Sequence, residues 1–265
     1  MAPKSRKKQP KPSNNKGRRG APEHPQSVWL YGRHAVSAAM MNPERPLRCV
    51  LATKNARQWL TSQKIDPQLV DKVTSSDAQE IDRRLPQGAV HQGIAAEVDN
   101  LPAVDLNSIC HAPSRHGPIL VLDQITDPQN IGAIFRAAAG FGARAIIVQD
   151  RKTPPLSGAL AKAAAGAIEV LPCVAVVNIA RTLEALRDFG YHCAGLAGAA
   201  SHDLDGLPDD QPIALVLGAE GSGLRRLVAD TCDELYRIPI SDRVESLNVS
   251  TATAVALYEI NRSKS

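Results

Sequence analysis

The C-terminal half of the chain alternates short, continuously apolar runs with stretches in which apolar residues recur at helical spacing. Apolar runs that predict strands cover 119–123, 145–148, 168–172, 191–195, 213–217 and 236–240. Helices are predicted around 131–140, 157–164 and 180–189, from about 224, and over 248–261. Continuously apolar strands that alternate with helices are typical of a mostly parallel sheet with helices on both faces. In such a sheet, ligands bind at the carboxyl ends of the strands.

A second, shorter alternation of helices and strands precedes this half. The pattern predicts helices at 32–41, 55–63 and 76–85, and strands at 47–52, 68–73 and 93–98. Residues 99–117 contain proline and glycine with little periodicity, which is typical of a linker. The sequence therefore predicts a small α/β domain over 27–98, a linker over 99–117 and a larger α/β domain over 118–265.

The positive charge of the chain is concentrated at its N-terminus. Residues 1–20 contain eight Lys and Arg and no acidic residue, whereas the whole chain has a net charge of only +4. Such a segment cannot bury apolar surface, so residues 1–26 are predicted to be a disordered basic tail. A flexible polycation beside a folded domain commonly binds phosphates, which favours RNA as a partner. A solubilising extension is the alternative.

Composition argues against several classes of protein. The chain has no run of eighteen apolar residues and no secretory signal pattern, so we expect a soluble cytoplasmic protein without a membrane partner. The five cysteines are widely spaced without a CxxC pair, which argues against disulfides and a structural zinc site. Cys173 and Cys193 lie in apolar surroundings and are predicted to be core residues. The seven histidines are scattered, so no metal site is expected.

The loop after the 119–123 run contains the first unusual polar residues. Asn130 is placed to cap the helix that follows, which is its plain structural explanation. Arg136 follows six residues later, in a helix otherwise rich in alanine, isoleucine and phenylalanine. These small neighbours allow a ligand or another chain to come close, although the side chain could also extend to solvent. We interpret Arg136 as a functional residue.

A glycine-rich loop, Gly218–Gly223, joins the 213–217 run to the next predicted helix. Its three glycines allow backbone amides to approach a ligand. The loop matches neither a Walker loop nor the GxGxxG motif of dinucleotide-binding proteins. Glu220 is informative, since a carboxylate is unsuited to a phosphate but suits a hydroxyl or ammonium group. An exposed acid in a tight turn is the alternative.

The third loop extends from Ile238 to Asn248. Pro239 lacks a backbone donor, so the chain is expected to leave the sheet here. Ser246 and Asn248 precede the last helix, and capping explains one of them but less easily both. The free backbone groups of 238–247 could surround a flat ligand similar to adenine.

Considered together, the three loops resemble the signature motifs of the SpoU (TrmH) family of RNA ribose 2′-O-methyltransferases in the SPOUT superfamily. The matches cover 130–142, 217–224 and 238–250, within a resemblance that extends over about 118–263. Tyr31–Val36 and Ala89–Ala96 are similar to the small substrate-binding domain of the RlmB-type subgroup, which resembles a ribosomal RNA-binding protein. Ser222 departs from the pattern, because an acid is expected there, but it lies beside the motif.

The resemblance implies a C-terminal trefoil knot, S-adenosylmethionine bound in the knot largely by backbone groups, and a homodimer joined through the knot region. It also implies methylation of a ribose 2′-hydroxyl of RNA, at a guanosine in the peptidyl-transferase region of 23S ribosomal RNA. The implied catalytic residues are Asn130, Arg136, Glu220, Ser246 and Asn248. The implied cofactor-binding residues are Leu196, Ala197, Gly198, Gly218, Ile238, Ile240 and Leu247. No metal is required, because the methyl donor already carries its leaving group.

By this resemblance, Arg136 is the catalytic residue and acts near the substrate phosphate. Arginine is a difficult base because its pKa lies above about 12. Two roles therefore stay open for it, removing the hydroxyl proton or orienting the ribose and phosphate. Three other functions remain as alternatives: methylation of transfer RNA, RNA binding without catalysis, and a nucleotide-binding dehydrogenase. The missing GxGxxG motif argues against the last.

Overall fold

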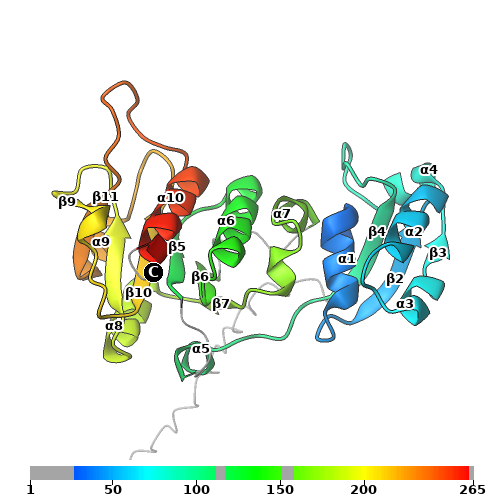
Figure 1. Cartoon of the computed structure of the whole chain (residues 1–265), viewed down its shortest axis with the longest axis horizontal. Helices are drawn as coiled ribbons and strands as arrows, with labels where there is room; N and C mark the ends of the chain where they lie inside the picture. The colour runs from blue at the N-terminus through cyan, green and yellow to red at the C-terminus, as the bar shows by residue number, and fades with distance from the viewer. Residues whose placement is uncertain (1–26, 112–116, 151–157, 263–265) are drawn as a thin grey trace, which may run out of the picture.

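Two β-sheets organise the computed structural model, which describes residues 27–111, 117–150 and 158–262 (Figure 1). The N-terminal sheet has the strand order β1 (Ser27–Tyr31), β4 (Ile94–Asp99), β2 (Leu47–Ala52), β3 (Thr74–Ser75). Strand β4 is antiparallel to both of its neighbours, whereas β3 is parallel to β2. The helices of this part are α1 (Arg33–Met41), α2 (Lys54–Thr61), α3 (Pro67–Asp71) and α4 (Ala78–Asp82). The predicted basic tail, residues 1–26, lies outside the described residues.

The strand predicted at 68–73 is wrong, because most of these residues form helix α3. The Asp66 side chain accepts a hydrogen bond from the Gln68 amide at 2.9 Å, and Pro67 occupies the first helical turn. Both features favour the start of a helix. They outweigh the apolar spacing of this short segment, which strands and helices share.

The C-terminal sheet has seven strands, and all of its pairings are parallel. Their order is β7 (Cys173–Val176), β6 (Ala145–Gln149), β5 (Ile119–Asp123), β10 (Ile213–Gly218), β8 (His192–Leu196), β11 (Glu234–Arg237), β9 (His202–Asp203). The predicted mostly parallel sheet is therefore confirmed. The strand predicted at 168–172 is wrong, because Ile168 and Glu169 belong to a 3-10 turn, η1 (Ala167–Glu169), which follows the left-handed Gly166, and β7 begins only at Cys173. Strand β11 ends before Pro239, which cannot donate to the sheet.

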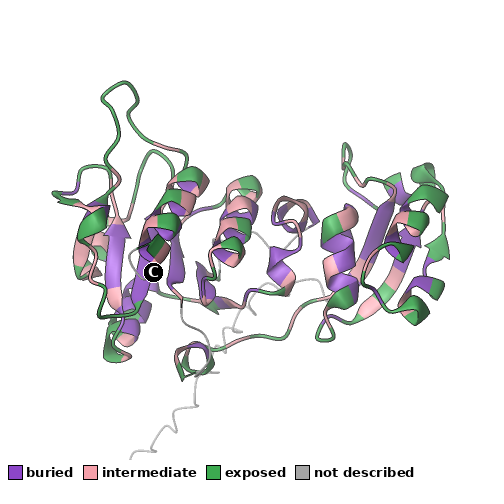
Figure 2. Cartoon of the chain, viewed as in Figure 1, coloured by how far each residue is buried: buried purple, intermediate pink, exposed green. Residues whose placement is uncertain are grey.

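Helices cover both faces of this sheet, so that its strands are buried between them (Figure 2). Alternate residues of β5 belong to two different buried clusters, because successive side chains of a strand point to opposite faces. One cluster includes α6 (Pro128–Gly140), α7 (Gly158–Ala163) and α10 (Val249–Arg262), and the other includes α5 (Leu106–His111), α8 (Ile179–Asp188) and α9 (Arg226–Thr231). A second 3-10 turn is η2 (Leu204–Gly206). Within the described ranges, no helix is long and apolar enough to cross a membrane.

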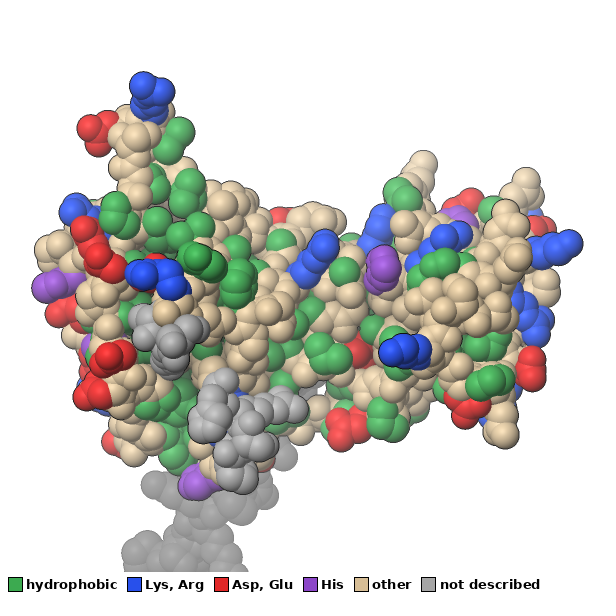
Figure 3. Space-filling view, viewed as in Figure 1, with side chains coloured by type: hydrophobic (Ala, Val, Ile, Leu, Met, Phe, Trp, Pro, Cys, Tyr) green, Lys and Arg blue, Asp and Glu red, His purple; other side chains and the backbone are tan. Residues whose placement is uncertain are grey.

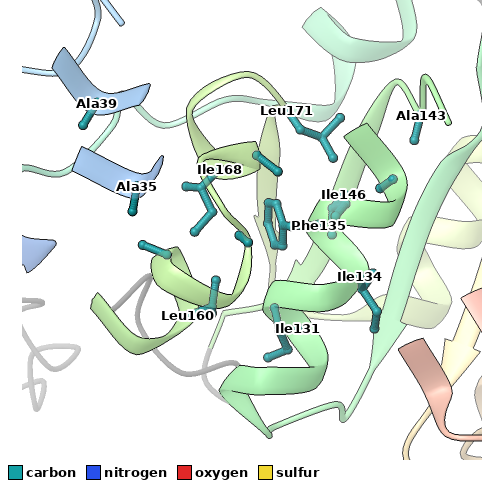
Figure 4. Packing of buried hydrophobic residues seen from close by; sticks show 14 of the residues in the cluster. Ala35, Ala39, Ile131, Ile134, Phe135, Ala143, Ile146, Leu160, Ile168 and Leu171 are labelled. Atoms are coloured by element: carbon teal, nitrogen blue, oxygen red, sulfur yellow. The ribbon is translucent and has the colours of Figure 1, made fainter. Parts of the chain in front are cut away.

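The two sheets are connected by a packed junction. Helix α7 lies against β1, and η1 lies against α1. Ala35 and Ala39 of α1 face the apolar cluster around Ile168 (Figure 4). A Cβ atom at Gly166 would lie 2.6 Å from the Cβ of Ala38, so the close approach of these segments requires glycine there.

A buried ion pair lies at the same junction. Arg45 donates to the Glu169 carboxylate through Nε at 3.0 Å and through Nη2 at 2.8 Å, and each side chain is only 3% exposed. Arg45 Nη1 donates to the Asp99 carbonyl at 2.9 Å, and Asn42 Nδ2 donates to the Glu169 carboxylate at 2.9 Å. Because both charges are buried and hydrogen-bonded, this pair ties the N-terminal sheet to η1 in one geometry.

Candidate active site

The carboxyl ends of four neighbouring parallel strands meet at one edge of the C-terminal sheet. Strands β5, β10, β8 and β11 are consecutive in the sheet. The register pairs Gly218 with Asp123, and it pairs Leu196 with both Leu217 and Tyr236. The strands therefore end at nearly the same level. The three loops with unusual polar residues leave from β5, β10 and β11, at the edge where ligands bind in such sheets.

Asn248 joins all three loops. Its Nδ2 donates to Asn130 Oδ1 at 2.9 Å and to Glu220 Oε1 at 2.6 Å. The same Glu220 oxygen accepts a hydrogen bond from the Val249 amide at 3.3 Å. Asn248 Oδ1 accepts a hydrogen bond from the Ser250 amide at 2.9 Å and so caps α10. One side chain therefore fixes the start of α10 and holds a residue 118 positions away in the sequence.

The capping role expected of Asn130 is wrong. Asp127 caps α6, since its carboxylate accepts a hydrogen bond from the Asn130 amide at 2.9 Å. The side chain of Asn130 is thereby left for its hydrogen bond with Asn248. Ser246 is exposed in the loop before α10, and that helix is capped by Asn248 instead.

Arg136 is exposed on α6, and its side chain forms no hydrogen bond or ion pair with any residue in the described part of the chain. Six residues correspond to about 9 Å along a helix axis, so Arg136 lies nearly two turns from Asn130. The structure does not bring Arg136 into the network around Asn248. Its guanidinium is an uncommitted positive charge with the planar geometry that suits a phosphate.

The Gly218–Gly223 loop turns back on itself at the end of β10. The Gly223 amide donates to the Ala219 carbonyl at 2.9 Å. A Cβ atom at Gly218 would lie 2.2 Å from the Gly223 carbonyl carbon, and Gly221 has a φ of 76°. The turn itself therefore accounts for these glycines. Glu220, by contrast, is engaged by Asn248 and Val249.

Asp123 is a residue of this edge that the sequence analysis missed. It ends β5, is fully buried, and accepts hydrogen bonds from Arg225 through the backbone amide at 2.9 Å and through Nε at 2.7 Å. The pair ties the end of β5 to the segment that follows the glycine-rich loop. The signal in the sequence was an acid at the end of the apolar run 119–123, because a buried carboxylate needs a partner.

The predicted cofactor-binding residues also lie along this edge. Leu196–Gly198 continues from β8, Gly218 ends β10, Ile238 and Ile240 follow β11, and Leu247 precedes α10. Leu196, Ile238 and Leu247 are partly buried, whereas Gly198 and Ile240 are exposed. The edge therefore offers partly buried apolar side chains beside the backbone of two loops.

Buried thiols lie at the opposite, amino-terminal end of the strands of this sheet. Cys193 is fully buried in β8 and Cys173 packs against the core, as predicted. Burial raises the pKa of Cys173, Cys193 and Cys232 to about 12 in each case. Such thiols are poor nucleophiles, because the thiolate is the reactive form. Among the described residues, no group of three or more His, Cys, Asp or Glu side chains could hold a metal ion.

Comparison with known protein families covers both parts of the chain. Residues 117–258 match the model of the SpoU rRNA Methylase family. Residues 29–104 match the model described as RNA 2′-O ribose methyltransferase substrate binding. The first match covers more than half of the chain. The chain therefore belongs to the SpoU rRNA methylase family, and the resemblance inferred from the three motifs is confirmed.

Curated relatives match over nearly the whole chain. The 23S rRNA (guanosine-2′-O-)-methyltransferase RlmB of Vibrio parahaemolyticus is 38% identical, over 89% of this chain and 97% of the relative. The enzyme of the same name from Pseudomonas aeruginosa is 39% identical, over 90% and 98%. The crystal structure of the SpoU methyltransferase AviRb from Streptomyces viridochromogenes with the cofactor AdoMet has a TM-score of 0.71 at 24% identity. It covers 90% of this chain and 91% of that one, which supports the fold.

Proposed function

We propose that this chain transfers a methyl group from S-adenosylmethionine to the ribose 2′-hydroxyl of a guanosine in 23S ribosomal RNA. The observation that carries this proposal is the network in which Asn248 binds both Asn130 and Glu220. It joins one polar residue from each of the three signature motifs at the carboxyl edge of the sheet. The names of relatives that match along about nine-tenths of the chain support the same substrate.

The edge suits the cofactor by the chemistry of its residues. The partly buried side chains of Leu196, Ile238 and Leu247 would contact an adenine ring, and the backbone of 218 and 238–240 would hydrogen-bond to its polar atoms. The cofactor supplies an electrophilic methyl group on a positively charged sulfur. No acidic cluster or metal is needed to activate it.

The residues of this chain would act mainly by positioning. A ribose hydroxyl is a poor nucleophile at neutral pH, so its proton must be attracted or removed as it attacks. Arg136 is exposed and unpaired among the described residues, which suits binding of the phosphate beside the target ribose. Asn130, Glu220 and Asn248 would hold α6 and α10 so that hydroxyl and methyl come into line. Ser246, in the exposed loop, would contact the nucleotide.

We further infer the organisation expected of this family. Residues 27–98 would form the domain that binds the RNA substrate, and residues 118–265 would form the domain that catalyses methyl transfer. Residues 99–117 would be the linker between these two domains. The basic tail would add nonspecific attraction to RNA. The same proposal includes three further points: the N-terminal part resembles a ribosomal protein, the C-terminal part contains a trefoil knot, and the protein is located in the cytoplasm.

A second copy of the chain would cover the exposed apolar side chains next to the site. Val255 and Tyr258 share one face of α10 and are 40% and 57% exposed. Ile240 and Val244 are exposed in the neighbouring loop. Exposed apolar groups of this kind mark interaction sites. Light scattering after gel filtration should give twice the chain mass, and Tyr258→Glu should give monomers.

The function is tested by incubating purified protein with methyl-labelled S-adenosylmethionine and either ribosomal RNA or transfer RNA. Label should appear in a 2′-O-methylguanosine of large-subunit RNA. Label in transfer RNA alone would assign the chain to a different substrate. A complete absence of label would leave RNA binding without catalysis as the better account.

The Arg136→Ala variant tests the assignment of the catalytic residue. We expect kcat/KM for RNA to fall at least about a hundredfold, since both proposed roles act on the reacting nucleotide. Affinity for S-adenosylmethionine, measured by calorimetry, should change less than about twofold. Arg226→Ala is the matched control, because Arg226 is an almost fully exposed arginine on another helix. A large loss of cofactor binding in Arg136→Ala would overturn the assignment.

A further inference from the structure

The junction between the two sheets carries a group of cationic and aromatic side chains that the active site does not use. Arg33 and His34 begin α1, Trp59 lies on α2, Gln92 precedes β4, and Lys162 lies on α7. We call these five residues the junction surface. Lys and Arg side chains lie over α7 and over the upper part of α1, with a His side chain beside them (Figure 3).

Contacts within the junction surface hold its members close together. The Arg33 guanidinium carbon lies 5.4 Å from the centre of the Trp59 ring, and the His34 ring meets the same ring edge-on at 6.1 Å. Gln92 Oε1 accepts a hydrogen bond from the Arg33 amide at 3.0 Å. A Cβ at the intervening Gly32 would lie 3.4 Å from Gln92 Oε1 and 3.5 Å from Lys162 Cγ. The junction surface therefore includes residues of both the N-terminal and the C-terminal part of the chain.

The positive charges of the junction surface are not neutralised within the described chain. Neither Arg33 nor Lys162 forms an ion pair there, and Arg33 Nε is shielded from solvent without a hydrogen-bond partner. Gln92 adopts a φ of 54°, which is strained for a residue other than glycine. Strained residues persist where the surrounding structure holds them, often at binding sites. The unneutralised positive charges point to an anionic ligand, and the strained backbone of Gln92 is consistent with a binding site there.

The junction surface is also tied rigidly to the catalytic edge. Helix α7 packs against α6 so closely that a Cβ at Gly132 would lie 2.4 Å from the Cβ of Ala163, the neighbour of Lys162. Gly132 lies two residues after Asn130 on α6. On the other side, the buried Arg45–Glu169 pair fixes α1 and η1. A ligand bound at the junction surface would thus be held at a fixed distance from the active site.

We propose that the junction surface binds a single-stranded segment of the substrate RNA beside the target nucleotide. Lys162 and Arg33 contact backbone phosphates, and an unpaired base stacks on the Arg33–Trp59 pair. Arginine planes and aromatic rings are the usual platforms for unpaired bases, and lysine and arginine supply the electrostatic part of binding. This proposal rests on the proposed function, because it takes RNA as the substrate.

The test compares Arg33→Gln/Lys162→Gln with a charge-matched control, Lys64→Gln/Lys72→Gln, whose lysines are exposed elsewhere on the N-terminal part. With an unmodified large-subunit RNA transcript, the first variant should bind about ten- to a hundredfold more weakly. The plot of log affinity against log salt concentration should become less steep for this variant, by roughly 1–2 in slope, because each lost phosphate contact accounts for about 0.7. KM should rise while kcat at saturating RNA and cofactor affinity stay unchanged, and the control should behave like wild type.

A fluorescence measurement keeps the proposal falsifiable if the double variant folds poorly. In Trp29→Phe protein, Trp59 is the remaining tryptophan, and the RNA transcript should quench its emission. The proposal that the junction surface binds RNA would be overturned if quenching were absent, or if the double variant bound RNA as tightly as the control. Either result would favour a protein partner at this surface. If wild-type protein methylates no RNA, the proposed function fails. If the wild-type protein methylates RNA but the double variant binds RNA as well as wild type does, only the proposed role of the junction surface is overturned.

Discussion

The buried pair Arg45–Glu169 allows a quantitative test of how firmly the two sheets are held together. Glu169→Gln keeps the shape of the side chain but removes the negative charge. Arg45 then keeps its hydrogen bond to the Asp99 carbonyl at 2.9 Å, yet its charge stays buried without a counter-ion. Removing one partner of a buried pair costs about 3–5 kcal/mol. The loss reaches this value only if the junction stays closed, because opening it would return Arg45 to water.

Urea unfolding followed by two signals distinguishes these outcomes. Both tryptophans, Trp29 and Trp59, belong to the N-terminal part, so fluorescence reports on that part, whereas far-ultraviolet circular dichroism reports on the whole chain. With a slope of about 3 kcal/mol/M, a loss of 3–5 kcal/mol lowers the midpoint by roughly 1–1.7 M urea. If the junction opens first, the fluorescence midpoint falls alone and the two curves separate.

Two controls make the reasoning refutable. Asp71→Asn breaks the exposed pair with Arg57, at 3.8 Å, and should cost less than about 1 kcal/mol. The double variant Arg45→Met/Glu169→Leu replaces the pair by apolar side chains and should recover most of the stability. A Glu169→Gln loss no larger than that of Asp71→Asn would show that the pair does not stabilise the junction.

Three further predictions follow from the packing and the buried groups. Asp123→Asn should lower the free energy of unfolding by about 2–4 kcal/mol in urea titrations, because Arg225 loses a buried charged partner. Gly132→Ala should lower it by about 1–3 kcal/mol, seen as a lower thermal midpoint, since its methyl group would meet α7. The raised pKa of the thiols of Cys193 and Cys232 stabilises the fold below pH about 9, and this contribution is lost as pH rises toward about 12. In native protein, Cys193 and Cys232 should therefore resist alkylation at pH 8, while in urea-unfolded protein both should react, as peptide mass spectrometry can show. Equal alkylation rates of these two thiols in both states would contradict the prediction.

The parallel sheet was predictable because its strands are buried on both faces and so appear as continuous apolar runs. The N-terminal part was harder, since its short elements carry apolar residues at spacings that fit either type of structure. At 68–73 the local start signal of Asp66 and Pro67 decided for a helix. The conformation there depended on two residues before the apolar run rather than on the run itself.

For the candidate site, the sequence alone determined which residues are unusual: Asn130, Arg136, Glu220 and Asn248 stand out in loops and helices whose patterns do not need them. Only the tertiary structure decided which of them touch. Asn248 binds Asn130 and Glu220 because β5 and β10 are neighbours, and strand order depends on pairings between distant segments. The same holds for Asp123 with Arg225 and for Arg45 with Glu169, where burial creates a need for a partner that local spacing cannot specify.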